Sequence, residues 1–203
     1  MESKRTQASR TAATRSALVS AARPLFTRRG FADVGTDELA RAAGVTRGAL
    51  YHQFGGKEEL FAAVFEEVEA DLTEAIGHRL AQADESDPVG LMRAGVDAWL
   101  DSCANPEVTR IVLIEAPAVL GWSRWREIGR RYGVGLIESA VTGAMAAGAI
   151  IEQPALPLAH VLSGALEEAA LYAVRADDLG RATEQVRRVL MLLLEGLIPA
   201  DCR

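Results

Sequence analysis

The chain has 203 residues, a formal net charge of −6, 49% hydrophobic residues and 25% charged residues. This length suits one large domain or two smaller ones, and this composition excludes wholesale disorder. Two cysteines, Cys103 and Cys202, and three histidines exclude a disulfide framework and supply few ligands for a metal site. We therefore expect no metal and no cofactor.

The sequence carries no recognisable membrane or export signal. No run reaches the roughly 20 apolar residues that a membrane-spanning helix needs. The first 15 residues lack the apolar core of a signal peptide. The expected location is the cytoplasm, with no membrane partner.

Charge is distributed unevenly along the chain. Residues 1–57 hold ten Lys and Arg against four Asp and Glu, whereas residues 58–203 hold twelve against twenty-four. Short windows fluctuate in charge, but a difference this large favours a basic N-terminal part that meets a polyanion.

Apolar residues recur at spacings of three and four along nearly the whole chain, which predicts an all-α protein of about nine helices. No stretch shows the period-two alternation of a half-buried strand. In chain order, helices are expected near residues 17–29, 36–43, 46–53, 57–72, 88–100, 106–115, 122–147, 158–175 and 178–197. The first three form one block and the rest another, with the helix from Lys57 as the joint.

Capping and breaking residues set several of these boundaries. Pro24 lies inside the first helix, where we expect a bend rather than a break because the apolar face continues past it. Thr36 and Thr46 are the expected N-caps of the two short helices, and Gly44 is expected to end the first of them. Pro117 is expected to interrupt the helices around it.

The two short helices between residues 35 and 54 are predicted to form a helix-turn-helix motif, whose second helix enters the DNA major groove. At 100° per residue, Leu50 and Phe54 share the core-facing side of that second helix. The residues on its other side and in its first turn are expected to meet DNA. They are Arg47, Gly48, Ala49, Tyr51 and His52.

The stretch from about Thr14 to Val68 resembles the DNA-binding domain of the tetracycline-repressor (TetR) family. The matching positions are Phe26, Gly30, Phe31, Thr36, the Leu-Ala-Arg-Ala-Ala-Gly-Val run of 39–45, Gly48, Leu50, Tyr51, Phe54, Lys57, Glu59 and Leu60. By motif the resemblance covers about a quarter of the chain, and the all-helical remainder agrees with the family's layout. It implies a homodimer that binds an operator near a promoter, usually as a repressor, and is released by a small ligand in its C-terminal domain.

The resemblance also suggests contacts for individual residues. Thr36 is a helix cap that in the family also reaches a phosphate, and Tyr51 is either half-buried packing or a phosphate contact, which the family pattern favours. Lys57 opens a helix N-terminus, where backbone donors attract phosphate, although Gly56 replaces the family's frequent Ser or Thr cap. Thr46 and Gly48 complete the expected DNA-binding set.

Base readout is assigned mainly to Arg47, because Arg pairs bidentately with guanine. Ala49 could contact a thymine methyl. For His52, the sequence is equally consistent with contact to a phosphate, contact to a base edge, or exposure to solvent. Within the basic N-terminus, Arg5, Arg10 and Arg15 form either an arm on the DNA or part of an unstructured tail.

No catalytic residues are expected. Residues 121–125 resemble a nucleophile elbow but have Trp where the final Gly belongs and no strand before them. His78 and His160 lie far apart without a supporting set of ligands. Residues 133–135 lack the third glycine of a dinucleotide-binding loop.

The C-terminal block is expected to bind a second copy of the chain and a small molecule. Its last two helices are strongly apolar, and the family buries such faces in a four-helix dimer bundle. The expected interface is Leu162, Leu166, Ala169, Ala173, Val186, Leu190 and Leu194. The candidate ligand-binding residues are Trp99, Glu115, Trp122 and Trp125, although core packing for the tryptophans and a surface or structural ion pair for Glu115 are equally consistent with the sequence.

The sequence thus predicts a helix-turn-helix domain at 11–57 and a ligand-binding and dimerisation domain at 58–203. The expected protein is a ligand-responsive repressor that binds a palindromic operator as a homodimer and responds to an apolar or amphipathic effector. The alternatives are an activator, a regulator without a ligand, or a helical binding protein or enzyme that has lost its DNA function.

Overall fold

The computed structural model describes residues 2–84 and 86–200, with side chains from residue 8 onward, and within that part every regular element is helical. The elements are α1 (Glu2–Arg29), α2 (Thr36–Ala42), α3 (Arg47–Phe54), α4 (Lys57–Leu80), α5 (Pro88–Ser102), η1 (Val108–Glu115), α6 (Ala116–Gly129), η2 (Arg130–Val134), α7 (Gly135–Ala146), α8 (Ala155–Val174) and α9 (Leu179–Glu195). The segments η1 and η2 are π-helical.

The chain forms two compact units, and each unit is built from two separate stretches of the sequence. The first, here called the head, contains the described residues up to Val68 together with Arg110–Trp125, and the second, here called the body, contains Glu69–Thr109 and the described residues from Arg126 onward. The expected boundary at residue 58 therefore falls inside the head, whose residues 110–125 come from much later in the chain.

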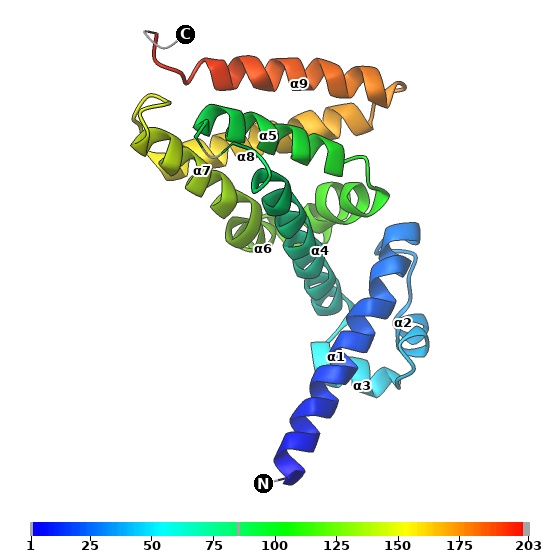
Figure 1. Ribbon diagram of the computed structural model, residues 1–203. Coiled ribbons are helices and arrows are strands. Elements are labelled where there is room, and N and C mark those ends of the chain that lie inside the picture. Colours follow the sequence, from blue (N-terminus) through cyan, green and yellow to red (C-terminus); the bar gives the residue numbers. More distant parts are fainter. Residues whose placement is uncertain (1, 85, 201–203) are drawn as a thin grey trace. The chain divides into compact units, whose positions relative to one another are not determined.

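In the head, α1, α2 and α3 pack against one another (Figure 1), and Phe26 of α1 contacts Phe61 of α4. The apolar positions that repeat at helical spacing form its core, and Leu18, Leu39 and Leu50 are fully buried. Phe26 and Phe31 lie 5.3 and 5.4 Å, ring centroid to ring centroid, from Phe61 of α4. These aromatic contacts hold α1 and the loop after it to α4.

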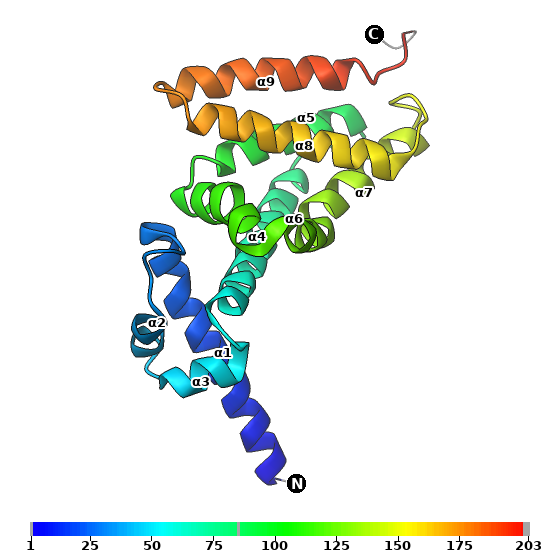
Figure 2. The same cartoon turned by 180° about the vertical axis from the view of Figure 1, so that it is seen from behind.

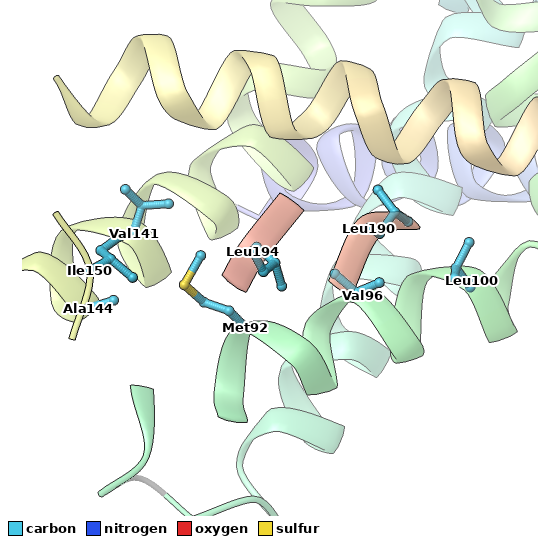
Figure 3. Packing of buried hydrophobic residues seen from close by; sticks show 8 residues of the cluster. All are labelled: Met92, Val96, Leu100, Val141, Ala144, Ile150, Leu190 and Leu194. Atoms are coloured by element: carbon cyan, nitrogen blue, oxygen red, sulfur yellow. The ribbon is translucent and has the colours of Figure 1, made fainter. Parts of the chain in front are cut away.

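In the body, α8 and α9 run side by side in both views (Figures 1 and 2) and pack with α5 and α7. Figure 3 shows part of the shared core, with Leu190 and Leu194 of α9 directed toward Met92 and Val96 of α5. Asp87 caps α5 by accepting a hydrogen bond from the Gly90 N–H, which agrees with the expected start at Pro88.

Several local expectations are confirmed and two are wrong. The helix α1 continues past Pro24, and Thr46 caps α3 as predicted. Thr36, however, is the first residue of α2 and makes no capping bond, because Gly35 occupies the cap position. Pro117 does not end the helical run, because η1 continues directly into α6, of which Pro117 is the second residue. The non-helical residue is Gly121, at φ 71° and ψ 162°.

No helix among the described residues is long and apolar enough to cross a membrane. The described part of the chain also contains no group of three or more His, Cys, Asp or Glu residues placed to hold a metal ion.

Candidate functional site

The helix α3 presents one face to solvent and buries the other in the head. The Thr46 hydroxyl accepts a hydrogen bond from Ala49 N at 3.2 Å, and Gly55 ends the helix in the left-handed conformation at φ 73°. Leu50 and Phe54 are buried, as the sequence predicts. The exposed face carries the side chains available to a partner, which are Thr46, Arg47, Tyr51 and His52, with Gly48 exposed and Ala49 half-buried between them.

Arg47 is held loosely at the start of this face. Its Nη1 lies 3.4 Å from both carboxylate oxygens of Asp37, and its guanidinium lies 5.5 Å from the centroid of the Tyr51 ring. Both Arg47 and Asp37 are mostly exposed, so this ion pair contributes little to folding. The guanidinium can therefore exchange Asp37 for an external acceptor while Tyr51 keeps it near the helix.

Lys57 has partners that the sequence did not predict. Its Nζ donates to the carbonyl oxygens of Phe31 and Val34 at 2.8 and 3.1 Å and lies 4.1 Å from the centroid of the Phe31 ring. Two of its three donors thus fix the segment between α1 and α2. This intramolecular role differs from the expected phosphate contact, which remains a prediction for the third donor.

The other expected contacts in the basic N-terminus are only partly described. Arg15 places its guanidinium 4.4 Å from the Phe54 ring centroid, which joins α1 to α3. Arg10 is exposed on α1. The side chain of Arg5 lies outside the described residues, although its backbone is part of α1.

Glu115 lies in the head and is not part of the lining of the apolar cavity described below. Its Oε2 accepts a hydrogen bond from Phe31 N at 2.5 Å, and its Oε1 lies 3.9 Å from Arg110 Nη1. A Cβ at Gly30 would lie 2.3 Å from Glu115 Oε1, and Gly30 also adopts a φ of +84°. The positive φ therefore favours glycine there, and the structural ion pair weighed for Glu115 agrees with the structure.

The body contains an apolar cavity with an empty volume of about 900 Å³, part of which is open to solvent. Apolar side chains of α4, α5, α7, α8 and α9 line it, including five of the residues labelled in Figure 3: Met92, Val96, Val141, Leu190 and Leu194. Trp99 also lines it, with its Nε1 donating to the Leu166 carbonyl at 3.0 Å. Its concave, mostly apolar lining is typical of small-molecule sites.

Two of the expected ligand residues lie elsewhere. Trp122 and Trp125 are not part of the cavity lining. They pair with each other at 5.2 Å between ring centroids, and Trp122 is 67% exposed. Trp99 is thus the one candidate of the four that lines the cavity.

Glu69, the acidic residue among the described residues of the cavity lining, was not predicted from the sequence. This side chain is 8% exposed, and burial, aided by the nearby charge of Glu167, raises its pKa to about 7. The signal was present in the sequence, because Glu69 lies on the apolar stripe of α4, four residues after Phe65 and three before Leu72.

The expected dimer residues on α8 and α9 face the interior of the same chain. Leu190, Leu194 and Ala173 are buried, and Leu162, Leu166, Ala169 and Val186 pack against the core of the body or lie half-buried beside it. Burial within the chain contradicts the prediction for Leu190, Leu194 and Ala173, and for the half-buried residues it stays a prediction. The sequence did not separate the two sides of α9 where every residue is apolar, from Val189 to Leu194. The exposed apolar side chains are Val161, Tyr172, Val189, Leu192 and Leu193, each more than half exposed.

Two family models match the chain. The model described as "Bacterial regulatory proteins, tetR family" matches residues 18–64, and "Tetracyclin repressor-like, C-terminal domain" matches residues 89–197. A crystal structure of a TetR-family transcriptional regulator from Pectobacterium atrosepticum is 34% identical with a TM-score of 0.82, over 96% of this chain and 98% of that one.

Two further relatives are similar in sequence. The transposon Tn10 TetC protein of Escherichia coli is 25% identical over 88% of this chain and 89% of its own length. The HTH-type transcriptional regulator AcrR of Shigella flexneri is 32% identical over 49% of this chain and 46% of its own length.

Proposed function

Because the chain belongs to the tetR family of bacterial regulatory proteins, and is thus a ligand-responsive DNA-binding transcriptional regulator, we propose that it acts as a repressor. In this proposal two chains bind a palindromic operator, with α3 of each in the major groove of one half-site. A small molecule in the cavity of the body lowers the affinity for that operator.

The exposed face of α3 is the observation that supports this proposal most directly. Its polar residues surround the exposed Arg47, whose guanidinium has a weak pair with Asp37 and a contact with the Tyr51 ring. Arg47 is assigned to a guanine, and Tyr51 and His52 to neighbouring phosphates or base edges.

The proposed dimer uses the outward faces of α8 and α9. Val161, Tyr172, Val189 and Leu192 are large apolar side chains exposed on these two adjacent helices. An apolar patch of this kind marks an interaction site, and a two-fold axis would let the same patch cover its copy.

A mobility-shift titration against the intergenic DNA upstream of the chain's own gene tests the proposal. A specific complex is expected, with a footprint of two related half-sites. If the dimer makes 6–10 phosphate contacts, its affinity falls by about 10³–10⁵ between 50 and 200 mM salt. Equal binding to operator and unrelated DNA, or an affinity that does not respond to salt, would contradict the proposal.

A further inference from the structure

Glu69 stands out in the cavity because an acidic group faces an otherwise apolar lining. Two other described residues of the lining, Thr73 and Trp99, carry a polar side-chain group. The Trp99 Nε1 already donates to Leu166 O. No Lys, Arg or His lines this cavity. Among the described residues, the influences on the pKa of Glu69 are burial and the charge of Glu167, and neither is a hydrogen bond or an ion pair. A buried, ionised carboxylate without a partner is costly, and a cation would offset that cost.

The second acidic group near the cavity is already satisfied. Glu167 of α8 accepts a hydrogen bond from Ser163 Oγ at 2.9 Å and lies 3.4 Å from Nη1 of Arg126. A positive charge on His160 would also favour the ionised form of Glu167. Because Arg126 and Ser163 serve Glu167, they do not neutralise Glu69, and the charge of Glu167 adds to the negative potential there.

From this arrangement we infer that the effector is a lipophilic organic cation, whose positive charge pairs with the Glu69 carboxylate while its apolar groups fill the cavity. The inference rests on the proposed function, because it names the chemical class of the effector in that same cavity. An anionic ligand would add a third negative charge beside Glu69 and Glu167 and is disfavoured. A wholly neutral ligand would leave the carboxylate without a counter-charge.

Tetraphenylphosphonium and tetraphenylborate form a suitable pair of probes, because they have nearly the same size and shape and carry opposite, permanent charges. Binding to the full chain is measured by isothermal titration calorimetry in sodium buffer at pH 8. Tetraphenylphosphonium is expected to bind at least about tenfold more tightly than tetraphenylborate.

Two variants separate the role of Glu69 from that of general negative charge. Glu69→Gln keeps the shape and removes the charge, so it should weaken tetraphenylphosphonium binding at least about tenfold. Glu167→Gln removes a charge from a neighbouring residue that is not part of the lining, and should change binding less than about threefold. Circular dichroism verifies that both variants are folded.

The pH dependence provides a test that needs no variant. Since the pKa of Glu69 is about 7 and neither probe titrates, the ionised fraction rises about tenfold from pH 6 to pH 8. Binding of tetraphenylphosphonium should strengthen by the same factor, and in Glu69→Gln it should be independent of pH even though His160 is still present.

The outcomes distinguish this inference from the proposed function. If Glu69→Gln retains operator binding but loses tetraphenylphosphonium, both stand. Equal binding of the two probes, unchanged binding in Glu69→Gln, or no binding of the phosphonium at any pH from 6 to 8 overturns the inference alone. Failure of the unmodified chain to bind operator DNA instead overturns the proposed function.

Discussion

Replacing Lys57 with methionine tests whether its ammonium group holds the segment between α1 and α2. Methionine keeps most of the apolar stem and removes the donor. The carbonyls of Phe31 and Val34, which now lie 2.8 and 3.1 Å from Nζ, would lose that donor, and the Phe31 ring would lose its cation.

The magnitude follows from these three contacts. A hydrogen bond to a charged group contributes about 1.5–3 kcal/mol, and an exposed cation–π contact about 0.5–1 kcal/mol. Lys57 is half-buried, so water replaces part of what is lost, and the free energy of unfolding should fall by about 2–4 kcal/mol. For a domain of about 60–100 residues, the Tm should then fall by at least about 8 °C.

Thermal unfolding followed by circular dichroism measures the change, and hydrogen exchange of residues 31–35 locates it in the head. The control is Arg41→Met, which removes one exposed positive charge from α2 and should cost less than about 0.5 kcal/mol. If Lys57→Met melts like the unmodified protein while the salt dependence of operator binding falls by one contact, the ammonium serves a DNA phosphate and our reasoning is wrong.

Three further changes have distinct expected results. Arg47→Ala should weaken operator binding by about 1–3 kcal/mol and relax preference at one base position per half-site, measured on single-base operator variants, with Tm unchanged. Val189→Asp with Leu192→Asp should give folded monomers by light scattering, whereas Leu190→Asp, on the buried side of α9, should unfold the body. The pKa of Glu69 is about 7 in the folded chain and 4.5 ordinarily, so the folded state binds the Glu69 proton more tightly than the unfolded state does. The free energy of unfolding should therefore fall by about 3 kcal/mol as the pH rises from about 4.5 to above 7. Denaturant unfolding across that range should show the fall, and Glu69→Gln should remove it.

The parts of the site that depend on local sequence were predictable. The outward face of α3, its Thr46 cap and its buried Leu50 and Phe54 all follow from helical periodicity and capping rules, which act within a few residues. The predicted start of α2 was wrong by one residue, because Gly35 and not Thr36 occupies the N-cap position.

The parts that depend on long-range contacts were not predictable. Lys57 donates to carbonyls 26 and 23 residues earlier, and Glu115 accepts from Phe31 across 84 residues, so spacing gave no sign of either bond. The sides of α8 and α9 were misassigned for a related reason. Periodicity marks an apolar side only when the opposite side is polar, and every residue of α9 from Val189 to Leu194 is apolar.

The segment Arg110–Trp125 limits how this protein can be divided. Glu115 of this segment accepts a hydrogen bond from the Phe31 N–H. Arg124 forms a bidentate ion pair with Glu59, with Nη1–Oε1 and Nη2–Oε2 distances of 2.5 and 2.6 Å. A fragment that stops at residue 68 loses both contacts. A chimaera that transplants only the first 68 residues onto another regulator's body would also lose both. Exchange of DNA specificity between relatives therefore requires grafting two separate pieces of chain, or changing only the exposed face of α3.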